Sequence, residues 1–77
     1  AGHGDLAVSL SMLVREAADG GLPVRFETAL ATCPVPAGVV EQVVRVVAEA
    51  LQNARRHAAP TRVVVTLARA DGAVRVA

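Results

Sequence analysis

The side chains best suited to chemistry lie in the segment EALQNARRHA, residues 49–58. Glu49 supplies a carboxylate, Asn53 follows four residues later with an amide oxygen, and Arg56 and His57 add two basic groups. A helix turns by about 100° per residue, so Glu49, Asn53 and Arg56 would share one stripe about 60° wide on its surface. His57 would lie on the flank of that stripe, about 80° from Glu49.

This combination of groups suits a magnesium-bound polyphosphate. Mg²⁺ prefers hard oxygen ligands, so the amide oxygen of Asn53 is a suitable ligand. The guanidinium of Arg56 can hold phosphate oxygens, and the carboxylate of Glu49 can orient or deprotonate a nucleophile. The exposed face of an ordinary helix carries similar residues. Two details favour chemistry: asparagine is a mediocre helix former, and the helix ends in a basic cluster of Arg55, Arg56 and His57 directly before an apolar strand.

A long helix over residues 39–58 is predicted to carry this stripe, and Pro60 ends it. On the side opposite Glu49 the pattern places a row of apolar residues that should face a sheet. The row consists of Val40, Val47, Leu51, Ala54 and Ala58. The helix is therefore amphipathic, with the candidate site on its outer face.

The segments before this helix predict another helix and a strand. Apolar residues at helical spacing predict a helix within residues 4–21, begun near Asp5 and stopped by the glycine pair at 20–21. Residues 22–30 alternate apolar and charged side chains, as a strand with one buried face does. Residues 31–38 are expected to form a loop, because their two prolines cannot continue a sheet.

Residues 61–77 predict two strands joined by a tight turn at Ala70-Asp71-Gly72. The order helix, strand, helix, strand, strand predicts an α/β fold, a two-layer sandwich with two helices packed on one face of a small mixed sheet. A chain of 77 residues allows one domain. Because the chain stops within the last strand, we expect a fragment whose open edge at residues 73–77 pairs with a second copy as a homodimer or in aggregates.

The composition argues against several classes of protein. Hydrophobic residues make up 53% of the chain, too many for a disordered protein. The net charge is +1 and the eight arginines are scattered, so binding of nucleic acid has little support. Cys33 is the only cysteine, which rules out an internal disulfide. No apolar run approaches the roughly 18 residues of a membrane span, and we expect a cytoplasmic setting.

The segment EALQNARRHA resembles the N box of the GHKL (Bergerat-fold) ATPase family, and TRVVVTLARADGAVRVA resembles the strand, turn and strand that follow it. The nitrate-sensor type of bacterial sensor histidine kinase has a similar sequence pattern in its catalytic domain. Almost every fixed position of that pattern is met between Glu49 and Val76. GGLPVRFE and PVPAGVVEQVVRVVAEAL also look like that family's first strand and its approach to the N-box helix. Residues 1–77 therefore resemble the N-terminal part of a kinase catalytic ATP-binding domain, before its first glycine box.

The resemblance implies a partial Bergerat fold and the cofactors ATP and Mg²⁺. In such a kinase Asn53 would coordinate the Mg²⁺ that bridges the ATP phosphates. Glu49 would help the phosphoacceptor histidine, or a water, to lose its proton. Arg56 and His57 would lie near the phosphates or help to close the lid over ATP. The γ-phosphate would pass to a histidine on a separate dimerisation domain of the parent kinase, and then to a response regulator; membrane attachment of that parent is left open.

Several parts of the family pattern are absent. The Asp-x-Gly-x-Gly loop, whose Asp reads the adenine, should begin just past Ala77, and the glycine-rich lid and the phosphoacceptor helices are absent too. We therefore expect this chain alone to bind ATP weakly or not at all. His3 is not expected to be the phosphoacceptor, because it lacks the acidic residue that usually follows one. Two other interpretations stay open: an anti-sigma-factor-type serine kinase of the same fold, and a non-catalytic α/β interaction module whose long helix docks a partner.

Overall fold

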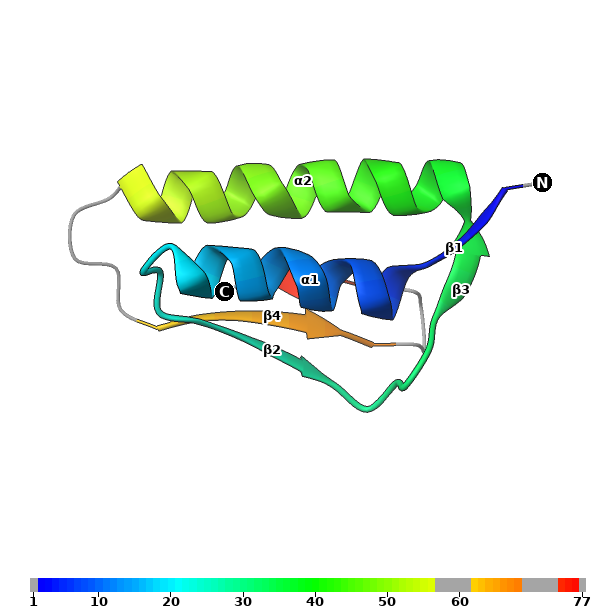
Figure 1. Cartoon of the computed structure of the whole chain (residues 1–77), viewed down its shortest axis with the longest axis horizontal. Coiled ribbons are helices and arrows are strands. Elements are labelled where there is room, and N and C mark those ends of the chain that lie inside the picture. Colours follow the sequence, from blue (N-terminus) through cyan, green and yellow to red (C-terminus); the bar gives the residue numbers. More distant parts are fainter. Residues whose placement is uncertain (1, 57–61, 69–73, 77) are drawn as a thin grey trace.

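Two helices lie over one face of a three-stranded sheet in the computed structural model, which describes residues 2–56, 62–68 and 74–76 (Figure 1). The elements are, in chain order, β1 (His3–Asp5), α1 (Leu6–Asp19), β2 (Val24–Thr28), β3 (Pro34–Pro36), α2 (Ala37–Arg56), β4 (Val63–Leu67) and β5 (Val74–Val76). The predicted α/β architecture, with both helices on one face of a small mixed sheet, is confirmed.

The three-stranded sheet has the order β2-β4-β5, with β2 parallel to β4 and β4 antiparallel to β5. Parallel neighbours need a long crossover connection, and α2 is part of the one that joins β2 to β4. Phe26 of β2 pairs with Val65 of β4, which pairs in turn with Val76 of β5. The pairing of β4 with β5 confirms the two predicted strands, while the predicted turn at residues 70–72 lies outside the described residues.

The segment at residues 31–38 is not the simple loop that its prolines predict, because β3 pairs with β1 in a second, two-stranded antiparallel sheet. Two backbone bonds enclose this pairing, one from Ala37 N to Gly2 O (2.6 Å) and one from Leu6 N to Cys33 O (2.8 Å). Hydrogen-bonded pairs alternate with non-bonded pairs in an antiparallel ladder, and both prolines of β3 fall at the non-bonded positions. Their missing N–H groups therefore cost the ladder nothing.

The end of α1 is set by its glycine pair, as predicted. Gly21 has a φ of 99°, a left-handed conformation that favours glycine. Its N–H donates to Ala18 O at 3.0 Å, and the N–H of Leu22 donates to Ala17 O at 3.1 Å. This pair of bonds is the Schellman arrangement, which satisfies helix carbonyls that would otherwise lack a partner. The chain then turns directly into β2.

One carboxylate joins the start of α1 to the segment before α2. Asp5 Oδ1 accepts a hydrogen bond from the backbone N–H of Val8 at 3.1 Å, so Asp5 is the N-cap of α1. The same oxygen accepts a second bond, from the backbone N–H of Cys33 at 3.0 Å. The sequence predicts only the first of these roles, because Cys33 is distant along the chain.

Replacing Asp5 by alanine should lower the free energy of unfolding by about 1–2 kcal/mol, since two backbone N–H groups lose their acceptor. Urea unfolding followed by circular dichroism measures this change. Asp19→Ala is the matched control, because its side chain is exposed at the other end of α1. Equal loss of stability in the two variants would contradict the role assigned to Asp5.

A single apolar core lies between the helices and the sheet. The residues buried in it are Leu6, Ala7, Leu10, Val14, Leu22, Val47, Leu51, Val63, Val65 and Leu67. They come from both helices, from β4 and from the turn before β2, so the core joins the two layers. Within the described residues, neither helix combines the length and the apolar character that a membrane span requires.

Leu10 is fully buried at the centre of this core, with 0% of its surface exposed. Leu10→Ala should lower the free energy of unfolding by about 2–5 kcal/mol, because it removes buried methyl groups and leaves a cavity. Chemical denaturation measures the loss. The control is Met12→Ala on the same helix, where 65% of the residue is exposed and a change within about 0.5 kcal/mol is expected. A similar loss in both variants would show that the core is not centred on Leu10.

Candidate functional site

Glu49, Asn53 and Arg56 lie on the exposed face of α2 and form what we call the polar ridge. The opposite side of the helix is buried, where Val47 and Leu51 enter the core. The helix is therefore amphipathic in the predicted sense, and the predicted exposure of all three side chains is confirmed. His57, the fourth predicted site residue, lies outside the described residues.

The composition of α2 explains why the ridge faces outward. Its apolar residues recur at helical spacing and are drawn into the core, which leaves the polar residues on the far side. Arg55 and Arg56 stand in the last turn, where cations interact favourably with the negative end of the helix dipole. Part of the basic cluster is thus explained by helix stability alone, without any ligand.

The side chains of the polar ridge are not engaged with other described parts of the chain. Within residues 2–56, 62–68 and 74–76, Glu49, Asn53 and Arg56 make no side-chain hydrogen bond or ion pair. The one ion pair of that region joins Arg25 to Glu27 at 3.0 Å on β2. The carboxylate and amide oxygens of the ridge therefore point to solvent, one helical turn apart.

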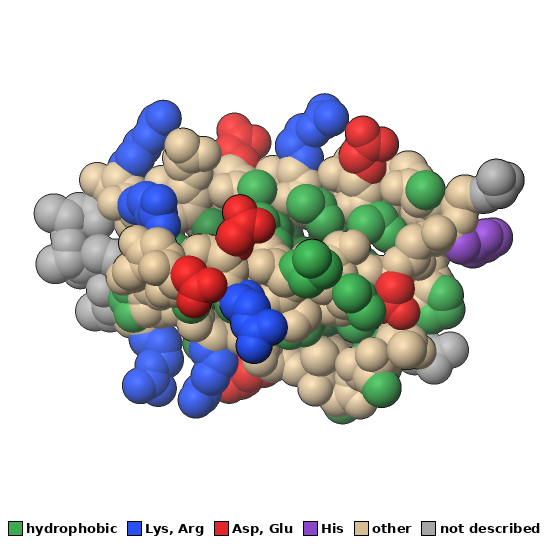
Figure 2. Space-filling model, in the orientation of Figure 1, with side chains coloured by type: hydrophobic (Ala, Val, Ile, Leu, Met, Phe, Trp, Pro, Cys, Tyr) green, Lys and Arg blue, Asp and Glu red, His purple; other side chains and the backbone are tan. Residues whose placement is uncertain are grey.

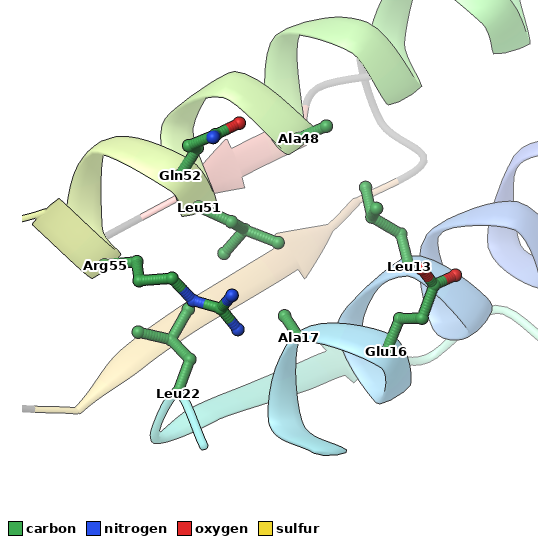
Figure 3. A pocket seen from close by; sticks show the side chains of 8 residues that line it. All are labelled: Leu13, Glu16, Ala17, Leu22, Ala48, Leu51, Gln52 and Arg55. Carbon is green, nitrogen blue, oxygen red and sulfur yellow. The ribbon is translucent and has the colours of Figure 1, made fainter. Parts of the chain in front are cut away.

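A cavity opens on another flank of α2. It lies between α1 and α2, has a volume of about 280 Å³, and takes Ala48, Gln52 and Arg55 from α2. Figure 3 shows the guanidinium of Arg55 extending toward α1, whose Glu16 and Ala17 also line the cavity. The ridge residues do not line it, so this cavity does not enclose the predicted site.

Arg55 is separated from Arg56 by the geometry of the helix. Its guanidinium reaches back toward the end of α1 and lies near Leu22 (Figure 3). A Cβ at Gly20 would overlap the guanidinium of Arg55, so this close approach depends on glycine. The sequence interpretation grouped Arg55 with the basic cluster of the site. The rotation of about 100° per residue already indicates from the sequence that Arg55 and Arg56 face different sides of the helix.

An apolar flank adjoins the polar ridge, and the sequence interpretation missed it. Val39 and Val46 are 41% and 62% exposed, and they stand at about 80° and 60° from Glu49 on the helical wheel. Asn53, at about 40°, continues the same line one heptad after Val46. The described residues of the chain therefore leave an apolar strip of α2 uncovered beside the amide.

The described residues hold no cluster of three or more His, Cys, Asp or Glu side chains that could bind a metal by themselves. Mg²⁺ is commonly held by one or two protein oxygens together with substrate phosphates and waters. The amide of Asn53 and the carboxylate of Glu49 would supply that number of protein oxygens.

Comparison of the chain with protein-family models, with curated proteins and with solved structures gave no match.

Proposed function

We propose that this chain is the N-terminal part of a GHKL-type ATP-binding domain from a bacterial sensor histidine kinase. In this proposal its complete parent transfers the γ-phosphoryl group of Mg·ATP to a histidine on a separate dimerisation domain, and from there to a response regulator. The fold would be the first part of a Bergerat fold, and the setting would be the cytoplasm. The proposal rests on the resemblance of residues 49–76 to the N box and the strands that follow it.

The observation that carries the proposal is the exposure of a carboxylate and an amide one turn apart on α2. Glu49 and Asn53 are both exposed, and neither oxygen-bearing group bonds to another described side chain. An asparagine within a helix is slightly costly because its amide competes with the helix backbone, which favours a use for Asn53 beyond covering the outer face. An exposed amide next to an acid can instead meet a metal-chelated phosphate.

Each ridge residue has a distinct task in this proposal. Asn53 would offer its amide oxygen to Mg²⁺, Arg56 would neutralise and orient phosphate oxygens, and Glu49 would accept a proton from the attacking group. Bound Mg·ATP would supply the phosphoryl group and charge neutralisation at its phosphates. The apolar strip at Val39 and Val46 would be covered by the remainder of the domain, which would also supply contacts to the adenine.

The full-length gene product tests the proposal. ATP binding measured by calorimetry should require Mg²⁺ and disappear with excess EDTA. Incubation with γ-labelled ATP should label the protein with a phosphate that acid removes and alkali does not, as expected of phosphohistidine. An acid-stable label would favour the serine-kinase alternative, and absence of both binding and labelling would leave the interaction module as the better interpretation.

A further inference from the structure

A second surface of the helical layer has the character of a docking site, and the proposed kinase chemistry makes no use of it. The groove lies between the middle of α1 and the N-terminal half of α2 and has a volume of about 480 Å³. Its apolar lining consists of Met12, Leu13, Ala37, Val40 and Val44. Met12 is 65% exposed, the highest exposed fraction among the large hydrophobic side chains of the described residues. Apolar surface of this kind commonly marks a place where another chain binds.

The shape of the groove favours a helix as the occupant. α1 and α2 run side by side with their N-terminal ends at the same end of the molecule (Figure 1). The space between two such helices is a trough along their axes, into which the side chains of a third helix can pack. The sheet covers the other side of these helices, so the trough opens away from the core.

The charges around the groove favour a basic occupant. Two acidic residues line it, Glu16 from α1 and Glu41 from α2, and both are exposed. No arginine is among the described residues that line the groove, and neither Glu16 nor Glu41 forms an ion pair with a described cation. Figure 2 shows hydrophobic side chains gathered on the face where the two helices lie side by side, with charged side chains of both signs around them. The groove is therefore apolar, with one glutamate from each helix in its lining.

We propose that the groove binds an amphipathic helix of a partner protein, with leucine-type anchors on one face and lysine or arginine along its edges. The anchors pack on Met12 and Val44, and the basic side chains approach Glu16 and Glu41. Apolar contact supplies most of the affinity, while the charges at the rim set the preference for a basic partner and its salt dependence. The surface is independent of the polar ridge, so this interaction holds or fails separately from the kinase proposal.

The probe is a synthetic amphipathic helix of leucine and lysine, titrated into the labelled 77-residue chain and followed by NMR. Amide shifts should centre on the groove, around Met12 and Val40. A peptide of leucine and glutamate should bind more weakly, and a scrambled leucine–lysine peptide without an apolar face should not bind. Shifts centred elsewhere, or equal binding of the acidic and basic peptides, would overturn the proposal.

Three variants locate the interaction. Met12→Ser should weaken binding at least about tenfold, because it removes an anchor contact. Glu41→Lys should weaken it about two- to fivefold at low salt, with the difference lost at high salt. Asp19→Lys makes the same charge change on α1 outside the groove, and should have a smaller effect. All three positions are exposed, and unchanged thermal unfolding confirms that each variant folds.

The oligomeric state of the free chain separates a partner helix from a second copy. Sedimentation should show that the unliganded chain does not associate through this groove, so Met12→Ser should leave its oligomeric state unchanged. A dimer that Met12→Ser converts to a monomer would overturn the proposal, because a second copy would then be the occupant. Equal peptide affinity of the parent chain and Met12→Ser would overturn it as well.

Discussion

Asn53→Ala should weaken Mg²⁺-dependent ATP binding by the full-length gene product at least about 100-fold, since changes to groups that only support a metal ligand already cost 10- to 100-fold. The amide oxygen is the single neutral oxygen donor of the polar ridge, and alanine has none to replace it. The fold should not suffer, because Asn53 is exposed and alanine is the better helix former by about 0.5 kcal/mol. Weaker binding accompanied by equal or higher stability would therefore identify a ligand-binding role.

Gln42→Ala provides the matched control for this experiment. Gln42 is exposed on α2 and lies close to the line of the polar ridge, but about 16 Å before Asn53 along the helix axis. Its loss should leave ATP affinity unchanged. If Asn53→Ala bound Mg·ATP as tightly as the parent protein, or if both variants lost affinity to the same extent, the metal-binding role of Asn53 would be wrong. Calorimetry with and without Mg²⁺ gives the affinities, and thermal unfolding gives the stabilities.

The helices and strands with regular apolar spacing could be predicted from the sequence. Leu6, Leu10 and Val14 of α1 are buried, as their spacing indicates, and the glycine pair ends that helix. The alternation in β2 likewise places Val24 and Phe26 against the core. These predictions succeed because each rests on a local rule: a helix or strand with one apolar face has to bury that face.

The features that the sequence did not predict depend on contacts between distant segments. The pairing of β3 with β1 was missed because a proline excludes a strand only where its N–H is needed. Whether it is needed depends on the register, and the register is fixed by bonds such as the one from Ala37 to Gly2. The turn of Arg55 toward Gly20 depends in the same way on where α1 ends. The predicted pairing of the edge at residues 73–77 with a second copy stays a prediction.

The exposure of the polar ridge could be predicted from the sequence, but the role of its residues could not. Helical geometry places Glu49, Asn53 and Arg56 on one stripe, and the burial of Val47 and Leu51 turns that stripe outward. Helical geometry does not determine which group or ligand the ridge faces. The uncovered apolar strip at Val39 and Val46 indicates that α2 has room for a further contact on that side. The roles of the ridge residues are therefore decided by experiments that separate binding from transfer.

The variant Glu49→Gln separates ATP binding from phosphoryl transfer. Glutamine keeps the size of the side chain and can still accept or donate a hydrogen bond, but it cannot take up a proton at neutral pH. Because Glu49 is proposed to accept the proton and not to hold Mg²⁺, ATP affinity should change by less than about threefold, while the rate of phosphoryl transfer should fall by about 10²- to 10⁴-fold, the usual contribution of a general base. Single-turnover labelling with γ-labelled ATP measures that rate in the full-length gene product.

The control for Glu49→Gln is Glu27→Gln. Glu27 is also exposed and lies on β2, where it pairs with Arg25 at 3.0 Å, away from the polar ridge. An exposed ion pair of this kind contributes at most about 1 kcal/mol, so this variant should fold and transfer phosphate at the parent rate. If Glu49→Gln also transferred at the parent rate, Glu49 would not be the base. If it lost ATP binding together with transfer, the carboxylate would belong to the metal site, and Asn53 would share that site with it.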